Sequence, residues 1–109
     1  MITVNVVRDE SGFIWQYIVE GHAEFAEEGK DIICSAVSVL AYTGINALEE
    51  LVGIKNYGIE KGYMICSVPT DILPELKEKV RIILETIVVG FEQLQLTYED
   101  YISVIDEEV

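Results

Sequence analysis

Few residues in this sequence can bind a metal or form a disulfide. The chain has two cysteines and one histidine among its 109 residues. Cys34, Cys66 and His22 form neither a CxxC nor an HxxxH pattern, so we expect no metal site and no cofactor. The first residues alternate like a strand and carry no secretory signal, which indicates reduced thiols and a cytoplasmic location.

Basic residues and long apolar runs are also scarce. Seven Lys and Arg stand against 20 Asp and Glu, which gives a formal net charge of −13. This charge repels phosphates, so direct nucleic-acid binding is not expected. It either keeps copies of the protein soluble and apart or attracts a basic partner. No uninterrupted apolar run approaches the roughly 18 residues of a membrane span, so no membrane association is expected.

The hydrophobic pattern predicts one α+β domain over residues 1–109, because the chain is long enough for one core but not for two. Apolar spacings of three and four predict a largely buried helix from Asp31 to about Val52 and an amphipathic helix over about 73–94. Ala36, Ala41, Gly44 and Ala47 would let the first helix approach a sheet or a second helix closely. Alternation and turn residues predict strands at 2–6, 13–20, 55–60, 63–68 and 101–105. The order ββαββαβ predicts a mostly antiparallel sheet with two helices packed on it.

Cys34 is placed where a helix would activate a thiol. If Asp31 caps the first helix, Cys34 is its third residue, near unpaired N–H groups and the positive end of the helix dipole. Both favour the nucleophilic thiolate, and the same N–H groups could donate to an oxyanion. The alternative is that Cys34 is a small buried hydrophobic residue. Cys66, inside a predicted strand, is assigned to the core.

His22 is the only histidine, so any imidazole acid–base role belongs to it. It follows the second predicted strand, where its side chain could face the start of the helix. A predicted loop flanked by Gly21 and Gly29 connects it to Cys34. A lone histidine can also be an ordinary surface or core residue, so spacing alone indicates only a possible Cys–His pair.

Asp31 has two possible roles. It can cap the helix by accepting backbone N–H bonds, or it can orient His22 as a third member of the site. The cap is favoured, since a carboxylate beside Cys34 opposes thiolate formation.

A longer motif surrounds these residues, in the run GHAEFAEEGKDIICSAVSVL. It resembles the signature of the bacterial ribosomal-processing cysteine proteases (Prp): Gly-His-Ala, a variable loop, then Gly-x-Asp-Ile-[Val/Ile]-Cys-[Ala/Ser]-Ala-Val-Ser. Chain length and element order agree with that family over essentially the whole sequence. Ile33 and Ser35 stand where Val and Ala are frequent, which are minor departures.

The resemblance implies a function. In that family the matching residues form a catalytic dyad, which implies these roles for His22 and Cys34. Family members are small homodimers that remove a short N-terminal extension from a large-subunit ribosomal protein, cutting after an aromatic residue. Gly21 and Asp31 would support the dyad. The loop residues Ala23, Glu24, Phe25 and Gly29 would order over an extended substrate peptide, with Phe25 the aromatic expected to contact it.

Two other functions fit the same residues. The chain could be a non-catalytic acidic module that binds a basic ribosomal or assembly protein, with Cys34 and His22 as packing residues. It could also be a thiol redox enzyme or a small-molecule hydrolase, although no second cysteine lies near Cys34 in sequence.

Overall fold

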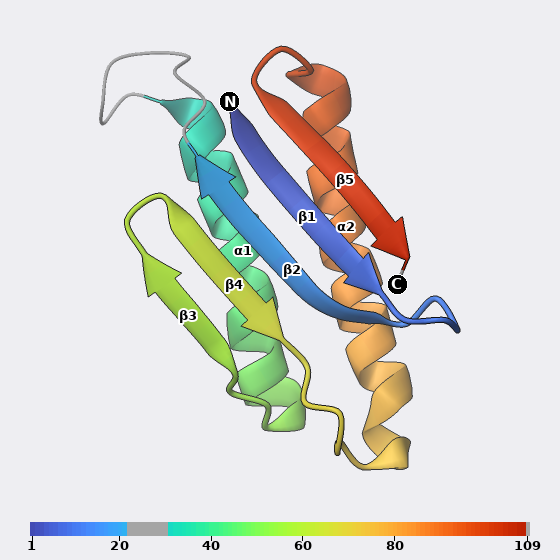
Figure 1. The fold of residues 1–109 in the computed structure, drawn as a ribbon. Coiled ribbons are helices and arrows are strands. Elements are labelled where there is room, and N and C mark those ends of the chain that lie inside the picture. The colour runs from blue at the N-terminus through green and yellow to red at the C-terminus, as the bar shows by residue number, and fades with distance from the viewer. Residues whose placement is uncertain (22–30, 109) are drawn as a thin grey trace.

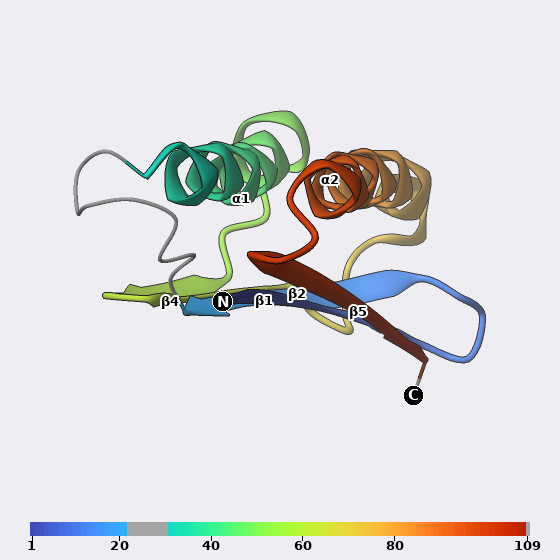
Figure 2. The ribbon, with the colours of Figure 1, turned by 90° about the horizontal axis from the view of Figure 1, so that it is seen from above.

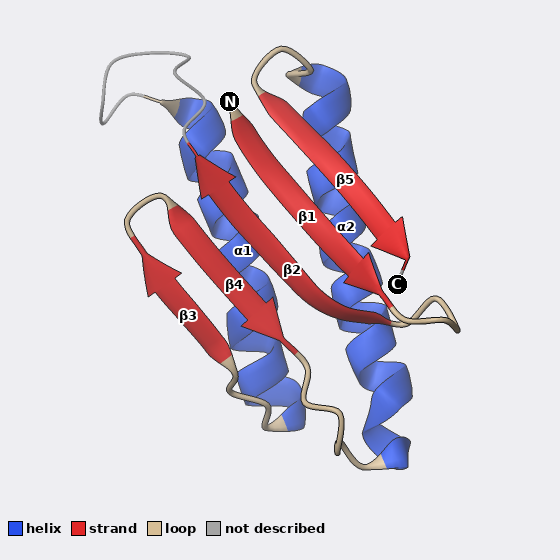
Figure 3. Cartoon of the chain, in the orientation of Figure 1, coloured by secondary structure: helices blue, strands red, loops and turns tan. Residues whose placement is uncertain are grey.

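The computed structural model describes residues 1–21 and 31–108, which form one sheet and two long helices (Figures 1 and 3). The elements are β1 (Ile2–Arg8), β2 (Ile14–Gly21), α1 (Ile32–Val52), β3 (Tyr57–Glu60), β4 (Tyr63–Ser67), the 3₁₀ turn η1 (Pro74–Leu76), α2 (Lys77–Thr97) and β5 (Ile102–Glu108). The predicted α+β class and the order ββαββαβ are confirmed.

The strands lie in the order β3-β4-β2-β1-β5. Three of the four strand pairings are antiparallel, and β5 pairs with β1 in parallel. The mostly antiparallel sheet is therefore confirmed. The parallel edge arises because α2 carries the chain from β4 across the sheet to the far side of β1, which a short turn cannot do.

Both helices lie side by side on one face of the sheet, so the domain has two layers (Figure 2). The core between the layers is built from alternate strand residues, such as Val4 and Val6 of β1, and from one face of each helix. The buried residues of α1 are Ile33, Val37, Ala41, Gly44, Ile45 and Leu48. The alternating residues of the strands and the residues three or four apart on the helices therefore pack against each other between the two layers.

The prediction that α1 is largely buried is wrong. Ile32 is 58% exposed and Val39 is 65% exposed. By length and composition α1 is apolar enough to cross a membrane, with a hydropathy of 1.5, yet only 33% of that stretch is buried in the protein. A two-layer domain covers one side of a helix, so apolar residues that extend around α1 remain at the surface.

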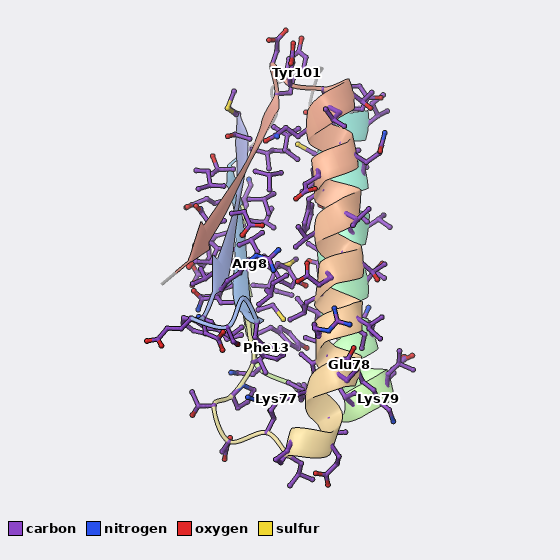
Figure 4. All side chains as sticks on the ribbon, turned by 90° about the vertical axis from the view of Figure 1, so that its right-hand side faces the viewer. Arg8, Phe13, Lys77, Glu78, Lys79 and Tyr101 are labelled. Atoms are coloured by element: carbon purple, nitrogen blue, oxygen red, sulfur yellow. The ribbon has the colours of Figure 1, made fainter. Side chains whose placement is uncertain are left out.

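The start of the second helix also differs from the prediction. The helix predicted from about residue 73 begins as an α-helix only at Lys77, because a 3₁₀ turn over Pro74–Leu76 precedes α2; no side chain caps that turn. Lys77 instead ties the start of α2 to the turn between β1 and β2, with its Nζ 5.5 Å from the centre of the Phe13 ring (Figure 4).

Arg8 joins three elements at the edge of the sheet. Its Nε donates to Asp106 Oδ1 of β5 at 2.7 Å, and its Nη1 donates to Glu85 Oε2 of α2 at 2.6 Å. Both carboxylates are bound through two nitrogens, and these charged hydrogen bonds raise the pKa of Arg8. The bidentate pairs hold the parallel strand β5 against β1 and α2.

Tyr17 holds α1 close to the sheet. Its ring is 1% exposed, and its hydroxyl donates to the Ala41 carbonyl at 2.7 Å. Gly44 makes this approach possible, because a Cβ built there would lie 2.4 Å from the Tyr17 oxygen. Of the small residues predicted to allow a close approach, Ala41 and Gly44 therefore do so toward the sheet.

This contact predicts a non-additive pair of substitutions. Gly44→Ala should lower the free energy of unfolding by about 1–3 kcal/mol, because the methyl group overlaps the Tyr17 hydroxyl. Tyr17→Phe should cost about 1 kcal/mol through the lost hydrogen bond. In the Tyr17→Phe background, Gly44→Ala should cost less, since the overlapping oxygen is gone. Denaturant titrations of the four proteins measure the coupling, and additive costs would contradict this account.

Candidate active site

Cys34 lies in the first turn of α1, as predicted. The helix begins at Ile32 with Asp31 as its N-cap, so Cys34 is the third helical residue. Its side chain is partly buried and packs against the core. Neither Cys34 nor Cys66 forms a disulfide, so both are present as thiols.

The carboxylate of Asp31 caps α1, which is the role favoured from the sequence. Asp31 Oδ1 accepts the backbone N–H groups of Ile33 and Cys34, each at 3.0 Å. The Asp31 carbonyl also accepts the N–H of Ser35 at 3.2 Å. The cap thus satisfies the groups that a helix start leaves unpaired.

This cap corrects one part of the predicted chemistry. The N–H groups of Ile33 and Cys34 were expected to be available to an oxyanion, but both donate to Asp31. The negative carboxylate also offsets the positive end of the helix dipole. In this arrangement these two N–H groups are therefore occupied by the cap and do not point to an oxyanion.

A groove of about 510 Å³ opens beside Cys34. Its lining comes from the first three turns of α1, from the sheet and from the turn between β3 and β4. The lining residues are Ile2, Val19, Gly21, Cys34, Val37, Ser38, Ala41, Tyr42, Ile59, Glu60, Lys61, Gly62, Tyr63 and Met64. Most of these residues are apolar or aromatic, and the charged ones, Glu60 and Lys61, lie in the turn between β3 and β4. Such a surface suits a peptide with large apolar side chains.

Gly21 fixes the path by which the chain leaves β2. Its φ is 95°, and a Cβ there would lie 2.4 Å from the Met1 carbonyl oxygen. Its N–H donates to the Gly62 carbonyl at 2.9 Å, so β2 is joined to the turn between β3 and β4. Only glycine fits this conformation and this contact without a shift of backbone. The residue immediately before His22 is therefore held at the groove.

The remaining predicted site residues lie outside the described residues. These are His22, Ala23, Glu24, Phe25 and Gly29. The predicted dyad therefore stays a prediction, as does the predicted loop over the substrate.

Cys66 is a core residue of β4, as predicted, and is 4% exposed. Burial raises the pKa of its thiol to about 11, although a hydrogen bond with Tyr17 acts in the opposite direction. A thiol that stays protonated at neutral pH is a poor nucleophile. Its environment thus contrasts with that of Cys34, which borders the groove.

A thiol at a helix start that borders a groove is an arrangement suited to a nucleophile. The family model described as "Cysteine protease Prp" matches residues 1–103. The chain therefore belongs to this family, and it is a cysteine protease.

Relatives of known name agree with this assignment. The ribosomal processing cysteine protease Prp of Bacillus subtilis is 29% identical over 107 residues, covering 95% of this chain and 96% of that protein. The protein of the same name from Staphylococcus aureus is 29% identical over 106 residues, covering 94% and 95%. In both comparisons the match therefore covers nearly the whole length of the relative.

Solved structures share the fold over the full length. The crystal structure of SMU.848 from Streptococcus mutans has a TM-score of 0.82 and 27% identity, covering 100% of this chain and 96% of that one. The essential ribosomal processing protease Prp from S. aureus, crystallised with a covalently linked product peptide, has a TM-score of 0.82 and 24% identity, covering 98% and 100%.

The shifted pKa of Cys66 predicts a pH dependence of stability. The folded state keeps this thiol protonated up to about pH 11, whereas in the unfolded chain it ionises near its ordinary pKa of 9.0. The unfolded state therefore binds fewer protons between these values, and the free energy of unfolding should fall as the pH rises through them. The ionisation of this thiol should account for about 2–3 kcal/mol of the fall in the free energy of unfolding. Denaturant titrations across this range should show a shallower fall for Cys66→Ala, and an equal slope would contradict the assignment.

Proposed function

We propose that this protease removes a short N-terminal extension from a basic large-subunit ribosomal protein precursor, cutting after an aromatic residue. The observation that carries the proposal is the thiol of Cys34 at the start of α1, bordering the groove. The names of the relatives supply the process, since they are ribosomal processing proteases. The S. aureus relative was also crystallised with a substrate peptide.

The proposed mechanism uses Cys34 as nucleophile and His22 as its proton-transfer partner. His22 takes the thiol proton, and the Cys34 sulfur attacks the carbonyl carbon of the scissile peptide bond. The carbon–nitrogen bond then breaks, and His22 protonates the leaving amine. Water, deprotonated by His22, hydrolyses the resulting thioester and restores the thiol. Asp31 positions Cys34 by fixing the start of α1.

The oxyanion of the proposed reaction needs hydrogen-bond donors, and two N–H groups at the helix start are occupied by the Asp31 cap. The N–H of Cys34 is the donor nearest the sulfur, and it is bound to Asp31 at 3.0 Å. Substrate binding would have to draw the Asp31 carboxylate away from this N–H, or other groups in the groove would have to stabilise the charge. In the first case Asp31 could then turn to orient His22.

The groove and the charge of the chain fit such a substrate. Val19, Val37 and Met64 give the groove apolar surface that would accept an aromatic side chain. The net charge of −13 would attract a basic ribosomal protein and speed its encounter with the enzyme. The loop residues Ala23, Glu24, Phe25 and Gly29 are proposed to close over the bound peptide.

The remaining parts of the proposal concern the whole chain. Residues 1–109 act as a single cysteine protease domain, the protein works as a homodimer in the cytoplasm, and it needs no nucleic-acid or membrane contact for catalysis.

Cleavage of a precursor that bears its extension tests the nucleophile. Cys34→Ala should reduce the rate of cleavage by at least about a thousandfold, as loss of a catalytic nucleophile does. Cys66→Ala is the matched control, because it removes the other thiol from the core and should keep most of the activity. The proposal fails if Cys34→Ala cleaves at the wild-type rate.

Thiol alkylation tests the partner of Cys34 without a substrate. Iodoacetamide should modify Cys34 at neutral pH and leave Cys66 unmodified, which mass spectrometry of peptides distinguishes. His22→Ala should slow the modification of Cys34 by about tenfold or more, because the imidazole that removes the proton is absent. Equal and slow modification of both cysteines in the wild-type protein would favour the non-catalytic binding module.

A further inference from the structure

The strand β3 forms the edge of the sheet beside the Cys34 groove. Within the described part of the chain it pairs with β4 alone, so its outer side is an open edge (Figure 3). All four of its residues, Tyr57–Glu60, are exposed. An open strand edge presents backbone N–H and carbonyl groups that can pair with another extended chain, and proteins commonly cover such an edge.

The hydrogen bonds of the hairpin decide which backbone groups of β3 face outward. Just before β3, the Asn56 carbonyl accepts the N–H of Ser67 at 3.0 Å. In an antiparallel ladder only every second pair of residues exchanges hydrogen bonds. By this alternation Gly58 and Glu60 also bond to β4. The two other residues of β3 therefore turn their N–H and carbonyl groups to the open edge.

Those two residues, Tyr57 and Ile59, also face the groove side of the sheet. Tyr57 is paired with Cys66 and Ile59 with Met64, and both partners are buried under the helices. Paired residues turn their side chains to the same face of a sheet, so Tyr57 and Ile59 have theirs on the helix side. Ile59 accordingly lines the groove together with Cys34. The same short strand thus offers backbone bonds at its edge and a side chain in the groove.

The helix α1 forms another wall of this groove. Cys34, Ser38 and Tyr42 follow one another at intervals of four, so they lie in one row along the helix, and all three line the groove. The groove therefore extends along α1 from the thiol past Tyr42. Tyr42 and Ile59 are 42% and 43% exposed, which leaves both side chains with surface for a partner.

The opposite edge of the sheet is partly covered by the protein itself. The N–H of Val104 in β5 donates to the side-chain oxygen of Gln95 in α2, so this N–H is not available to another strand. Arg8 also binds the Asp106 side chain of β5. Among the residues that the structure describes, the chain thus protects the edge away from the groove and leaves open the edge beside it.

We propose that the peptide substrate binds as an additional strand on the open edge of β3. Its backbone would bond to the outward groups of Tyr57 and Ile59, and every second side chain would enter the groove between β3 and α1. This binding mode rests on the proposed function, since the scissile bond has to lie at Cys34. Backbone pairing would supply affinity for an extended segment, and the groove would select among its side chains.

The surroundings of the edge favour an extended peptide over a second copy of this chain. Only two residues of β3 turn their backbone groups outward, so two such strands would gain few hydrogen bonds from each other. A peptide gains the groove as well, because its alternate side chains contact α1. The net charge of −13 also attracts a basic precursor.

Amide hydrogen exchange measured by NMR tests the binding mode directly. The probe is a synthetic peptide that spans the cleavage site of the ribosomal protein precursor, added to the Cys34→Ala protein so that it binds without being cleaved. The N–H groups of Tyr57 and Ile59 should exchange at least about tenfold more slowly with the peptide bound. The N–H of Gly58 should change less, because it already bonds to β4, and those of β5 should not change.

Proline substitution tests the same bonds through kinetics. Ile59→Pro removes one outward N–H and leaves the bonds to β4 in place, as an edge strand allows. The KM for peptide cleavage should rise about five- to tenfold, with kcat within about twofold, because a ground-state hydrogen bond is lost. Ile59→Ala is the matched control, since it keeps the N–H and has a smaller side chain than proline; it should raise KM less. Tyr57→Pro gives an independent test if Ile59→Pro does not fold.

The outcomes separate this binding mode from the proposed function. A wild-type protein that neither binds nor cleaves the peptide would overturn both. Cleavage of the peptide with unchanged exchange at Tyr57 and Ile59 would overturn the binding mode alone, and so would a larger rise in KM for Ile59→Ala than for Ile59→Pro. Slow exchange of these N–H groups without peptide, increasing with protein concentration, would assign the edge to a second copy. Alkylation of Cys34 at the wild-type rate in the position 57 and 59 variants shows that the nucleophile is intact.

Discussion

The site depends on the hydrogen bonds between the Asp31 carboxylate and the start of α1. These bonds set the residue at which the helix begins, and the direction of the Cys34 side chain follows from that start. They also have a chemical cost, because the carboxylate takes up the N–H groups of Ile33 and Cys34 and offsets the helix dipole. The cap therefore fixes the place of the thiol while it weakens the favourable field of the helix dipole. In the proposed chemistry His22 takes the proton of this thiol.

The position of α1 over the sheet depends on a second contact, made two turns further along. The Tyr17 hydroxyl bonds to Ala41, and Gly44 lets the helix come close enough for that bond. Ala41 also lines the groove, so the contact that packs the core sets one wall of the site. At the other end, Gly21 joins the end of β2 to Gly62. The groove is therefore bounded by elements whose spacing is fixed by packing and backbone bonds.

Much of the fold follows from local patterns. Alternation along the strands and the spacings of three and four in the helices depend on which face each residue turns to the core, so element type and order could be predicted. The family motif located Cys34, and the cap at Asp31 followed from its side chain. Other predictions failed for reasons that lie outside the local sequence. The second α-helix begins at Lys77 and not near residue 73, because the chain enters α2 through the 3₁₀ turn over Pro74–Leu76.

The amino-acid sequence alone determined the elements, the family and the place of Cys34 in the first helical turn, because these depend on residue types close together in the chain. Tertiary structure decided which apolar residues are buried. A single sheet covers one side of α1, so Val39 remains exposed although its sequence context resembles that of a core helix. It also decided that β5 pairs with β1 and that Arg8 binds both β5 and α2. Such contacts join residues far apart in the chain, and no local pattern records which of them will meet.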